Sequence, residues 1–464
     1  MKRGAPPPEW VPEITTSGPI YLAVVEALEA DIAAGVLNPG QRLPTHRSLA
    51  AALGVDLTTV TRAYAEARRR GLIDAEVGRG TSVRASPAAG ASARVETDLS
   101  MNMPPQPPAA AIQVRLARTM ASVLRRGDLA RLLSYHPGGG GPADRAVGAA
   151  WLAPLIPGLE AERVLLSGGA QAAIMALLTA VARAGDVILT EAFTYPGLLA
   201  AARQAGLRLQ GLPMDEEGLV PDALDEACER LGAKVLYCIP TIQNPTTATM
   251  SLARREAVAA VARRRRLTII EDDAYGLLPA APLPPLATFV PESTWYVSTV
   301  SKCLFPGLRI AYVVAPDAVQ ARRGQAALRA TAQMAPPLSA AVIARWVPDG
   351  TARAMLDAIR AESRERQRMA ASVLPAGSTA AHADGHHVWL RLPQAWNAPA
   401  FAEQVRRLGL AVVPGASFAA GPAPVEALRI SLGAAPDRDV LAGALGRIAA
   451  VLEQEEGLAP SEVV

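Results

Sequence analysis

The amino-acid sequence predicts an α/β protein in which a small helical module precedes a large domain built on a mostly parallel sheet. The chain has 464 residues, which is too long for one ordinary domain. Hydrophobic residues make up 50% of the chain and charged residues 19%, so large buried cores are possible. Beyond about residue 111, short apolar runs alternate with helix-like segments, a pattern typical of a sheet covered by helices on both faces.

Composition also divides the chain into parts. Residues 85–110 are rich in alanine, serine, glycine and proline, which is typical of a linker. We therefore expect a small domain over residues 15–84 and a large domain over residues 111–460. Strands of the large domain are expected at residues 163–167, 187–190, 234–239, 267–271, 295–300 and 310–315. A smaller C-terminal α+β subdomain is expected to follow, with strands at residues 388–392, 410–413 and 428–432.

The charge, cysteine and hydropathy patterns favour a cytoplasmic protein. The net charge of +3 is small for this length, so any nucleic-acid surface must be local. The chain's 3 cysteines show neither paired nor metal-ligand spacing, which fits a reducing compartment and indicates no metal site. The N-terminal residues lead into prolines and not into an apolar signal core, so export is not supported. The longest apolar stretch, residues 172–182, is too short to span a bilayer.

The N-terminal module has the pattern of a helix-turn-helix followed by a wing. Its first helix carries one apolar stripe at a spacing of four, which Gly35 ends: Ile20, Val24, Leu28 and Ile32. Two further helices, residues 46–53 and 58–70, flank a turn at Gly54. Strand-like patterns at residues 71–73 and 78–83 surround glycines and predict a basic-tipped wing. The combination predicts a winged helix-turn-helix.

In such a module the second helix of the pair enters the DNA major groove, and its first turn meets bases and phosphates. The residues that we expect to contact DNA are Arg47, Thr58, Thr59, Thr61, Arg62, Arg79 and Gly80. Between residues 40 and 84 eight arginines stand against four acids, so positive charge gathers where DNA would bind. The alternative is a structural helical subdomain whose arginines form a solvated face.

Lys302 stands out because the chain has only three lysines among its 46 basic residues. Arginine serves wherever a fixed positive charge is enough, but its guanidinium cannot be deprotonated to condense with an aldehyde. A lysine within the phrase SKCLFPGLR, residues 301–309, therefore suggests Schiff-base chemistry. For an isolated lysine the alternative is chance, so the surrounding residues decide between the two.

Pyridoxal phosphate would supply such an aldehyde, and its phosphate needs partners of its own. A predicted strand leads through Gly169, Ala170 and Gln171 into a predicted helix. A glycine turn that opens a helix presents free N–H groups and the positive end of the helix dipole, which suits a phosphate. Arg309 can pair with the same phosphate. Taken alone, such a turn is more often a feature of backbone geometry.

The remaining groups of this cofactor also find candidate partners. Asp272 follows an apolar strand at its carboxyl end, where α/β sheets place ligands, and a carboxylate there favours a protonated pyridine nitrogen. Asn244 and Tyr275 can donate to the phenolic oxygen, and Tyr195 can stack on the ring. Each of these residues also has an ordinary alternative role as a helix cap, a turn residue or a core residue.

Two resemblances support these interpretations. The segments GQRLPTHRSLA (residues 40–50) and TTVTRAY (residues 58–64) resemble the DNA-binding domain of the GntR family of bacterial regulators. This resemblance covers about residues 17–84. The cofactor motifs resemble those of the fold-type I aminotransferases, in the same order, over about residues 100–455.

The second resemblance implies further roles. Lys302 carries the Schiff base, and Arg429, in the segment LRISL, grips the α-carboxylate of the bound amino compound. Thr299 and Ser301 lie near the phosphate. Tyr135 reaches the phosphate of the neighbouring subunit, which implies a homodimer.

Four positions depart from the patterns of these families. Ala170 lacks the hydroxyl often found in the phosphate turn, and Thr247 stands where a glycine usually follows Asn-Pro-Thr. Thr61 and its neighbour Leu57 occupy a turn in which GntR relatives often carry arginine. DNA binding is therefore implied, but no base preference is.

A GntR-type winged helix joined to a fold-type I PLP-dependent transferase-like domain is the architecture of the MocR (GabR-like) regulators, which this chain resembles. The resemblance implies pyridoxal 5′-phosphate as cofactor, a double-stranded DNA operator as partner, and a small amino-compound effector. It implies a transcriptional regulator that senses this effector, or the cofactor itself, by exchange at Lys302. The alternative is a working amino acid aminotransferase with an accessory DNA-binding module, since all the parts for transamination are present.

Overall fold

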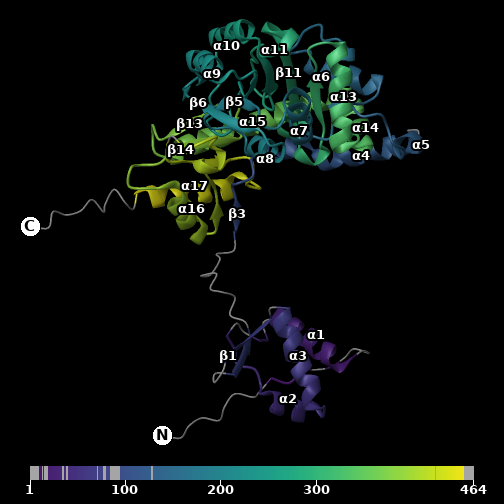
Figure 1. The fold of residues 1–464 in the computed structure, drawn as a ribbon, viewed down its shortest axis with the longest axis vertical. Helices are drawn as coiled ribbons and strands as arrows, with labels where there is room; N and C mark the ends of the chain where they lie inside the picture. The colour runs from purple at the N-terminus through teal and green to yellow at the C-terminus, as the bar shows by residue number, and fades with distance from the viewer. Residues whose placement is uncertain are drawn as a thin grey trace, which may run out of the picture. The chain divides into compact units, whose positions relative to one another are not determined.

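The computed structural model describes residues 10–12, 14, 19–33, 36–37, 40–70, 72–76, 80–83, 95–126, 129–423 and 425–453. The chain forms two compact units, Met1–Ser92 and Ala93–Val464 (Figure 1). None of the described helices combines the length and the apolar character that a membrane crossing requires.

The smaller unit is a winged helix-turn-helix, as the sequence predicts. Its elements are α1 (Ile20–Ala33), α2 (His46–Leu53), α3 (Leu57–Arg69) and an antiparallel hairpin of β1 (Ile73–Glu76) and β2 (Gly80–Val83). α2 ends at Gly54, whose φ of 65° lies in the left-handed region that glycine adopts without strain. α3 begins after Asp56, whose carboxylate accepts a hydrogen bond from the Thr58 backbone N–H at 2.8 Å. Four residues used in the prediction lie outside the described residues: Gly35, Gly71, Gly78 and Arg79.

The larger unit is built on a seven-stranded sheet with the strand order β4-β12-β11-β10-β9-β5-β6. Its strands are β4 (Val164–Ser167), β5 (Val187–Glu191), β6 (Arg208–Leu212), β9 (Val235–Cys238), β10 (Thr268–Asp272), β11 (Thr294–Thr299) and β12 (Ala311–Val314). β12 is antiparallel to β11 and β4, whereas the other neighbouring strands are parallel. The mostly parallel sheet is confirmed. The edge strand β6 escaped prediction because it is only partly buried and forms no continuous apolar run.

Helices cover both faces of this sheet. Successive side chains of a strand point to opposite faces, so strands that are apolar throughout need helices on both sides. Along β11, Trp295 and Val297 share a core with α7 (Ala170–Val181), α8 (Pro196–Gln204) and α13 (Ala318–Ala332). Tyr296, between them, faces the other side and packs with α6 (Pro142–Leu152) and α14 (Pro337–Trp346). Leu236 and Ile269 pack with the three remaining helices of the sheet: α9 (Pro221–Leu231), α10 (Leu252–Arg265) and α11 (Leu286–Phe289).

A C-terminal α+β subdomain completes this unit and confirms the predicted fold class. Its antiparallel sheet has the order β13-β14-β17-β16, with β13 (Thr379–Ala381), β14 (His387–Arg391), β16 (Val413–Pro414) and β17 (Ala427–Ser431). Three helices pack with it: α15 (Thr351–Val373), α16 (Ala398–Arg407) and α17 (Arg438–Glu453). Leu390, Phe401 and Ile430 lie in their shared core and are fully buried.

The large unit begins earlier in the chain than its expected start at residue 111. Residues 95–110, the second part of the expected linker, pack on the larger unit, where β3 (Thr97–Asp98) pairs with β15 (Leu410–Ala411). Leu99 is fully buried, and its carbonyl accepts a hydrogen bond from the Ser431 N–H at 2.9 Å. The prolines that give this stretch a linker composition therefore belong to a packed segment. The preceding residues 84–94 lie outside the described residues.

Candidate functional site

The predicted cofactor residues gather where the parallel strands of the large sheet end. Lys302 lies on the short helix α12 (Val300–Cys303), directly after β11. Its amino group donates a hydrogen bond to the Asn102 carbonyl and lies 6.0 Å from the centroid of the Tyr275 ring. Burial, together with the positive charge of Arg429, lowers the pKa of Lys302 to about 8. Its amine is therefore neutral at a lower pH than that of an exposed lysine.

Asp272 is the last residue of β10, and only 5% of it is exposed. The Tyr237 hydroxyl donates to its Oδ2 at 2.6 Å, whereas its Oδ1 is buried without a described partner. Burial raises the pKa of Asp272 to about 6, although the Tyr237 hydrogen bond acts in the opposite direction. A buried carboxylate oxygen without a partner at this sheet edge fits a ligand that brings a proton or a positive charge.

Asn244 and Arg429 meet in the structure. Arg429 Nη1 donates to Asn244 Oδ1 at 3.0 Å, and Nη2 donates to the Ser100 carbonyl. The guanidinium also lies 4.8 Å from the centroid of the Phe418 ring, and its Nε has no described partner. A buried guanidinium that retains a free N–H is suited to a carboxylate ligand.

Tyr275 and Tyr195 lie in the same region. The Tyr275 hydroxyl accepts a hydrogen bond from the Asn102 amide at 2.7 Å. Tyr195 precedes α8 and is half-buried, and burial, with the negative charge of Asp272 nearby, raises the pKa of its hydroxyl. Both rings therefore stay neutral and available for stacking or for donating a hydrogen bond.

The glycine turn before α7 lies against Arg309. Gly169 has a φ of 110°, and a Cβ placed on it would lie only 2.5 Å from Nη2 of Arg309. The guanidinium thus approaches the N-terminus of the helix that Ala170 begins, which is the arrangement that an anion requires. Gln171 donates to the Gly197 carbonyl at 3.0 Å and keeps a buried Oε1 without a described partner.

Two hydroxyls close to Lys302 bond to each other. Thr299 Oγ1 lies 3.0 Å from Ser301 Oγ and also accepts from the Ser301 backbone N–H at 3.1 Å. Both residues are buried. Tyr135, by contrast, is 84% exposed and lies after α5 (Leu129–Leu132), so the single chain leaves it open to a partner.

Several residues around Lys302 escaped the sequence analysis. Asn102 contacts both Lys302 and Tyr275, but it stands in the proline-rich stretch expected to be a linker. The His386 Nε2–H donates to the Lys302 carbonyl at 2.7 Å, and burial lowers the pKa of His386 to about 4. His387 Nδ1 lies 3.0 Å from the Asn102 amide. His386 and His387 are adjacent in the sequence and do not have the spacing of metal ligands, so nothing in the sequence indicated their role beside Lys302.

Most of the residues expected to contact DNA lie on α2 and α3 of the smaller unit. Arg47, Thr58, Thr61 and Arg62 are exposed, Thr59 is half-buried, Gly80 begins β2, and Arg79 lies outside the described residues. Two contacts modify the prediction. The Arg62 guanidinium lies 4.5 Å from the centroid of the Tyr21 ring, and the Thr58 hydroxyl donates to Asp56 at 2.5 Å. Arg47 is therefore more available for a phosphate contact than Arg62.

This fold and this set of side chains define a pyridoxal-phosphate-dependent fold-type I protein that carries a winged helix. The residues present fit the cofactor, because an unpartnered buried carboxylate, an anion-binding helix start and a buried amine are held together. A family model for class I and II aminotransferases matches residues 97–448, and one for bacterial regulatory proteins of the gntR family matches residues 20–83.

Comparison with individual proteins gives the same result. The chain is 31% identical to the helix-turn-helix transcriptional regulator YdeF of Bacillus subtilis, over 92% of this chain and 93% of YdeF. It is 28% identical to the vitamin B6 salvage pathway transcriptional repressor PtsJ of Salmonella typhimurium, over 90% of this chain and 95% of PtsJ. Among solved structures, it resembles the α-aminoadipate aminotransferase LysN of Thermus thermophilus complexed with N-(5′-phosphopyridoxyl)-L-leucine. That match has a TM-score of 0.71 and 26% identity, and it covers 85% of this chain and 100% of LysN.

The chain belongs to the class I and II aminotransferase family and, with its N-terminal unit, to the MocR/GabR-like transcriptional regulators of the GntR family. Pyridoxal 5′-phosphate is the cofactor that this fold and site imply.

Proposed function

We propose that this regulator is a cytoplasmic homodimer that binds an operator in double-stranded DNA and senses an amino compound, or pyridoxal phosphate itself, at Lys302. The observation that supports the proposal is the gathering of candidate cofactor partners around Lys302 in a chain that also contains a winged helix. A purely structural scaffold would not need a buried amine of lowered pKa beside an unpartnered carboxylate.

When bound, the cofactor supplies an aldehyde carbon that condenses with primary amines. In this chain Lys302 would hold that carbon, Asp272 would favour a protonated pyridine nitrogen through its Oδ1, and Arg309 with the start of α7 would hold the phosphate. Arg429 binds the carboxylate of an amino acid effector through its free Nε and through the N–H groups now shared with Asn244 and Ser100. An amine held there competes with Lys302, and this competition is the sensing event.

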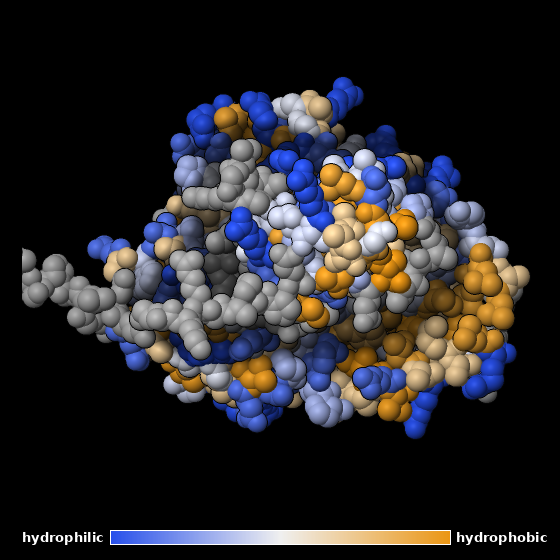
Figure 2. Space-filling model, turned by 90° about the horizontal axis from the view of Figure 1, so that it is seen from below, coloured by the Kyte–Doolittle hydropathy of each residue, from blue (hydrophilic) through white to orange (hydrophobic). Residues whose placement is uncertain are grey.

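An apolar surface on the larger unit supports the homodimer. Its members lie on or next to α4 (Ile112–Arg126) and α5, and 44% or more of each is exposed: Val114, Leu124, Leu129, Leu133 and Tyr135. Figure 2 shows hydrophobic residues gathered on the side where Figure 1 draws these two helices. Exposed apolar side chains gathered on one side of a protein mark an interaction site, and a second copy of the chain would bury them.

The lowered pKa of Lys302 predicts how cofactor uptake depends on pH. Because the neutral amine is the reactive form, the uptake rate should rise with pH and reach half of its maximum near pH 8. Stopped-flow absorbance of cofactor-free protein mixed with pyridoxal phosphate, from pH 6 to 10, measures this rate. Nα-acetyl-lysine is the control, since it reports the pH dependence of the cofactor itself. A half-maximum at the pH found for acetyl-lysine would contradict the prediction.

A salt titration tests the DNA-binding surface. We expect Arg47→Ala to weaken binding to any DNA sequence and to reduce the slope of log K against log salt by about 1, because one phosphate contact is lost. Arg62→Ala should have a smaller effect, since its guanidinium packs on Tyr21. Fluorescence anisotropy with DNA from upstream of the gene, between 50 and 200 mM salt, measures both. Arg68→Ala, an exposed arginine outside the predicted contacts, is the control, and an equal loss there would refute the assignment.

The proposal as a whole is tested by combining two measurements on one preparation. A panel of amines is added to the purified protein, the visible spectrum is recorded, and the affinity for the upstream DNA is measured by gel shift. An amine that changes both the spectrum and the affinity supports the proposal. Steady transfer of the amino group to a keto acid, without any DNA binding, would instead favour the aminotransferase alternative.

A further inference from the structure

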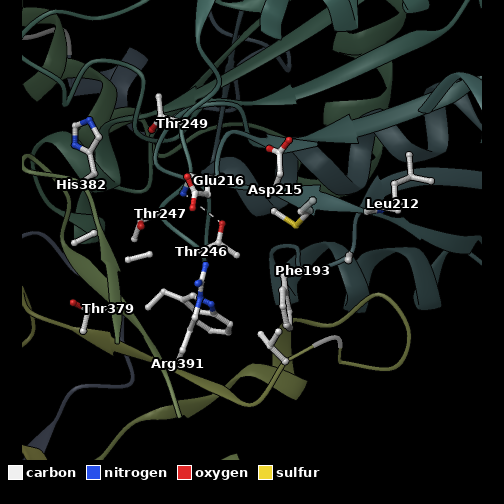
Figure 3. A pocket seen from close by; sticks show the side chains of 18 of the residues that line it. Phe193, Leu212, Asp215, Glu216, Thr246, Thr247, Thr249, Thr379, His382 and Arg391 are labelled. Carbon is white, nitrogen blue, oxygen red and sulfur yellow. Dashed lines mark hydrogen bonds between the residues drawn. The ribbon is translucent and has the colours of Figure 1, made fainter. Parts of the chain in front are cut away.

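The larger unit contains a second cavity, of about 1190 Å³, which does not include Lys302 (Figure 3). It lies between the large sheet and the C-terminal subdomain. Its walls come from the hairpin of β7 (Met214–Asp215) and β8 (Gly218–Leu219), from the loop of residues 246–249, and from β13 and β14. This volume is sufficient for a small organic molecule.

One wall of the cavity is aromatic. The rings of Phe193 and Trp389 meet edge to face, with centroids 5.1 Å apart, and both residues are buried. Met214, which is half-buried, also lines the cavity. Aromatic rings with a polarizable thioether beside them suit the flat apolar body of a ligand.

The guanidinium of Arg391 supplies a positive charge to the same cavity. Arg391, the last residue of β14, points into the cavity in Figure 3, and its guanidinium makes no hydrogen bond or ion pair with any other described residue. Asp215 does not neutralise it, because Arg254 holds both oxygens of Asp215 at 3.0 and 2.7 Å. Glu216 also lines the cavity and opposes a second negative charge on a ligand. The charges thus select a monocarboxylate.

Thr247 lies in the cavity wall in a conformation that costs free energy. Its φ of 66° lies in the left-handed region, which is unfavourable for a β-branched residue and natural for the glycine that related sequences usually have here. Its N–H donates to the Gln243 carbonyl at 2.7 Å, which holds the turn, while its hydroxyl bonds to none of the described residues. Strain retained at a residue that faces a cavity points to a use for that side chain.

The cavity shares its walls with the cofactor site. Trp389 is the direct cross-strand partner of Arg429 in the pairing of β14 with β17. The loop that carries Thr247 begins at Asn244, which accepts the hydrogen bond from Arg429. The Phe193 carbonyl, two residues before Tyr195, accepts from Gln243 Nε2 at 2.6 Å. A ligand in the cavity would therefore contact the supports of the cofactor site.

We propose that this cavity is a second small-molecule site, which binds a monocarboxylate with an aromatic body. The carboxylate pairs with Arg391, the ring packs on Phe193 and Trp389, and the Thr247 hydroxyl bonds to the ligand. The site is separate from the sensing event at Lys302, so it does not depend on the proposed function.

Calorimetry of the full-length, cofactor-loaded protein with indole-3-propionate tests the proposal. We expect one saturable site per chain, and Arg391→Met should weaken binding by about 5-fold because a charge-assisted pair is lost at an exposed position. The neutral amide of the same acid should bind the wild type as weakly as the acid binds Arg391→Met. Arg203→Met, an exposed arginine on α8, is the matched control and should leave the affinity unchanged.

Two variants make the test decisive. If Arg429→Met removes binding while Arg391→Met does not, the probe occupies the cofactor site and the proposal is overturned; absence of saturable binding overturns it as well. Thr247→Gly should raise the Tm by about 2 °C, because strain is relieved, and should weaken the probe by about 2- to 10-fold, because a hydroxyl is lost. Unchanged affinity in Thr247→Gly would count against the site.

Discussion

Replacing Lys302 with alanine should abolish the covalently held cofactor. Of the two lysines that the structure describes, Lys302 lies with Asp272 and Tyr275, whereas Lys234 is exposed and donates to the Arg265 carbonyl. In the wild type, borohydride reduction followed by peptide mapping should place the reduced adduct on the peptide that contains residue 302. Loss of the label should be complete in Lys302→Ala, because no other described amine lies in the site.

Two controls sharpen this result. Lys302→Arg keeps the positive charge but cannot condense with an aldehyde, so it should lose the label as completely as the alanine variant. Lys234→Ala should keep the full label. A label on another residue of the wild type, or a label that survives Lys302→Arg, would refute the assignment of the attachment site.

Asp272→Asn should weaken cofactor binding by about 10- to 100-fold, which is the loss expected for one hydrogen bond to a charged group. Asparagine is isosteric, so its amide oxygen can still accept from Tyr237, and the substitution removes mainly the negative charge at the buried Oδ1. Equilibrium dialysis of pyridoxal phosphate against the cofactor-free variant measures the change. The absorption maximum should also move, since the protonation of the pyridine nitrogen loses its partner.

The matched control for this prediction is Asp225→Asn, on α9. Asp225 is also held by side chains, in this case by Arg265 at 2.5 Å and Arg264 at 3.1 Å, but it lies at the surface and outside the site. Its substitution should leave the affinity for the cofactor unchanged. Equal weakening in both variants would mean that Asp272 acts through overall stability and not at the ring nitrogen.

The elements of the fold were predictable because the buried strands are continuous apolar runs. Residues of β9 and β11 are buried on both faces of the sheet, so β9 is an unbroken apolar run and β11 has the apolar centre Trp295-Tyr296-Val297. β6 lacks this signal, since it lies at an edge of the sheet and runs from the exposed Arg208 through partly buried residues to the buried Leu212. The segment at Leu99 misled the composition argument, because prolines are equally compatible with a linker and with an extended strand that docks on a core.

The site was predictable where chemistry demands a particular side chain, as it does at Lys302 and Asp272. It was not predictable where the role depends on position in space. Asn102 lies 200 residues before its partner Lys302, and Tyr237 looks like any other apolar residue of a buried strand. Thr247 was visible as a departure from glycine, but its strain is a backbone angle that no residue type reveals.

The packing of Ser100 and Asn102 has a further consequence. Their carbonyls accept hydrogen bonds from Arg429 and Lys302, the two side chains that effector and cofactor would engage. Two of the hydrogen bonds that hold residues 100–102 on the large unit therefore come from groups whose availability depends on whether the site is occupied. The packing of residues 100–102 on the large unit and the binding of ligands are therefore coupled equilibria. Ligand binding must change the free energy of packing by the same amount as packing changes the free energy of ligand binding.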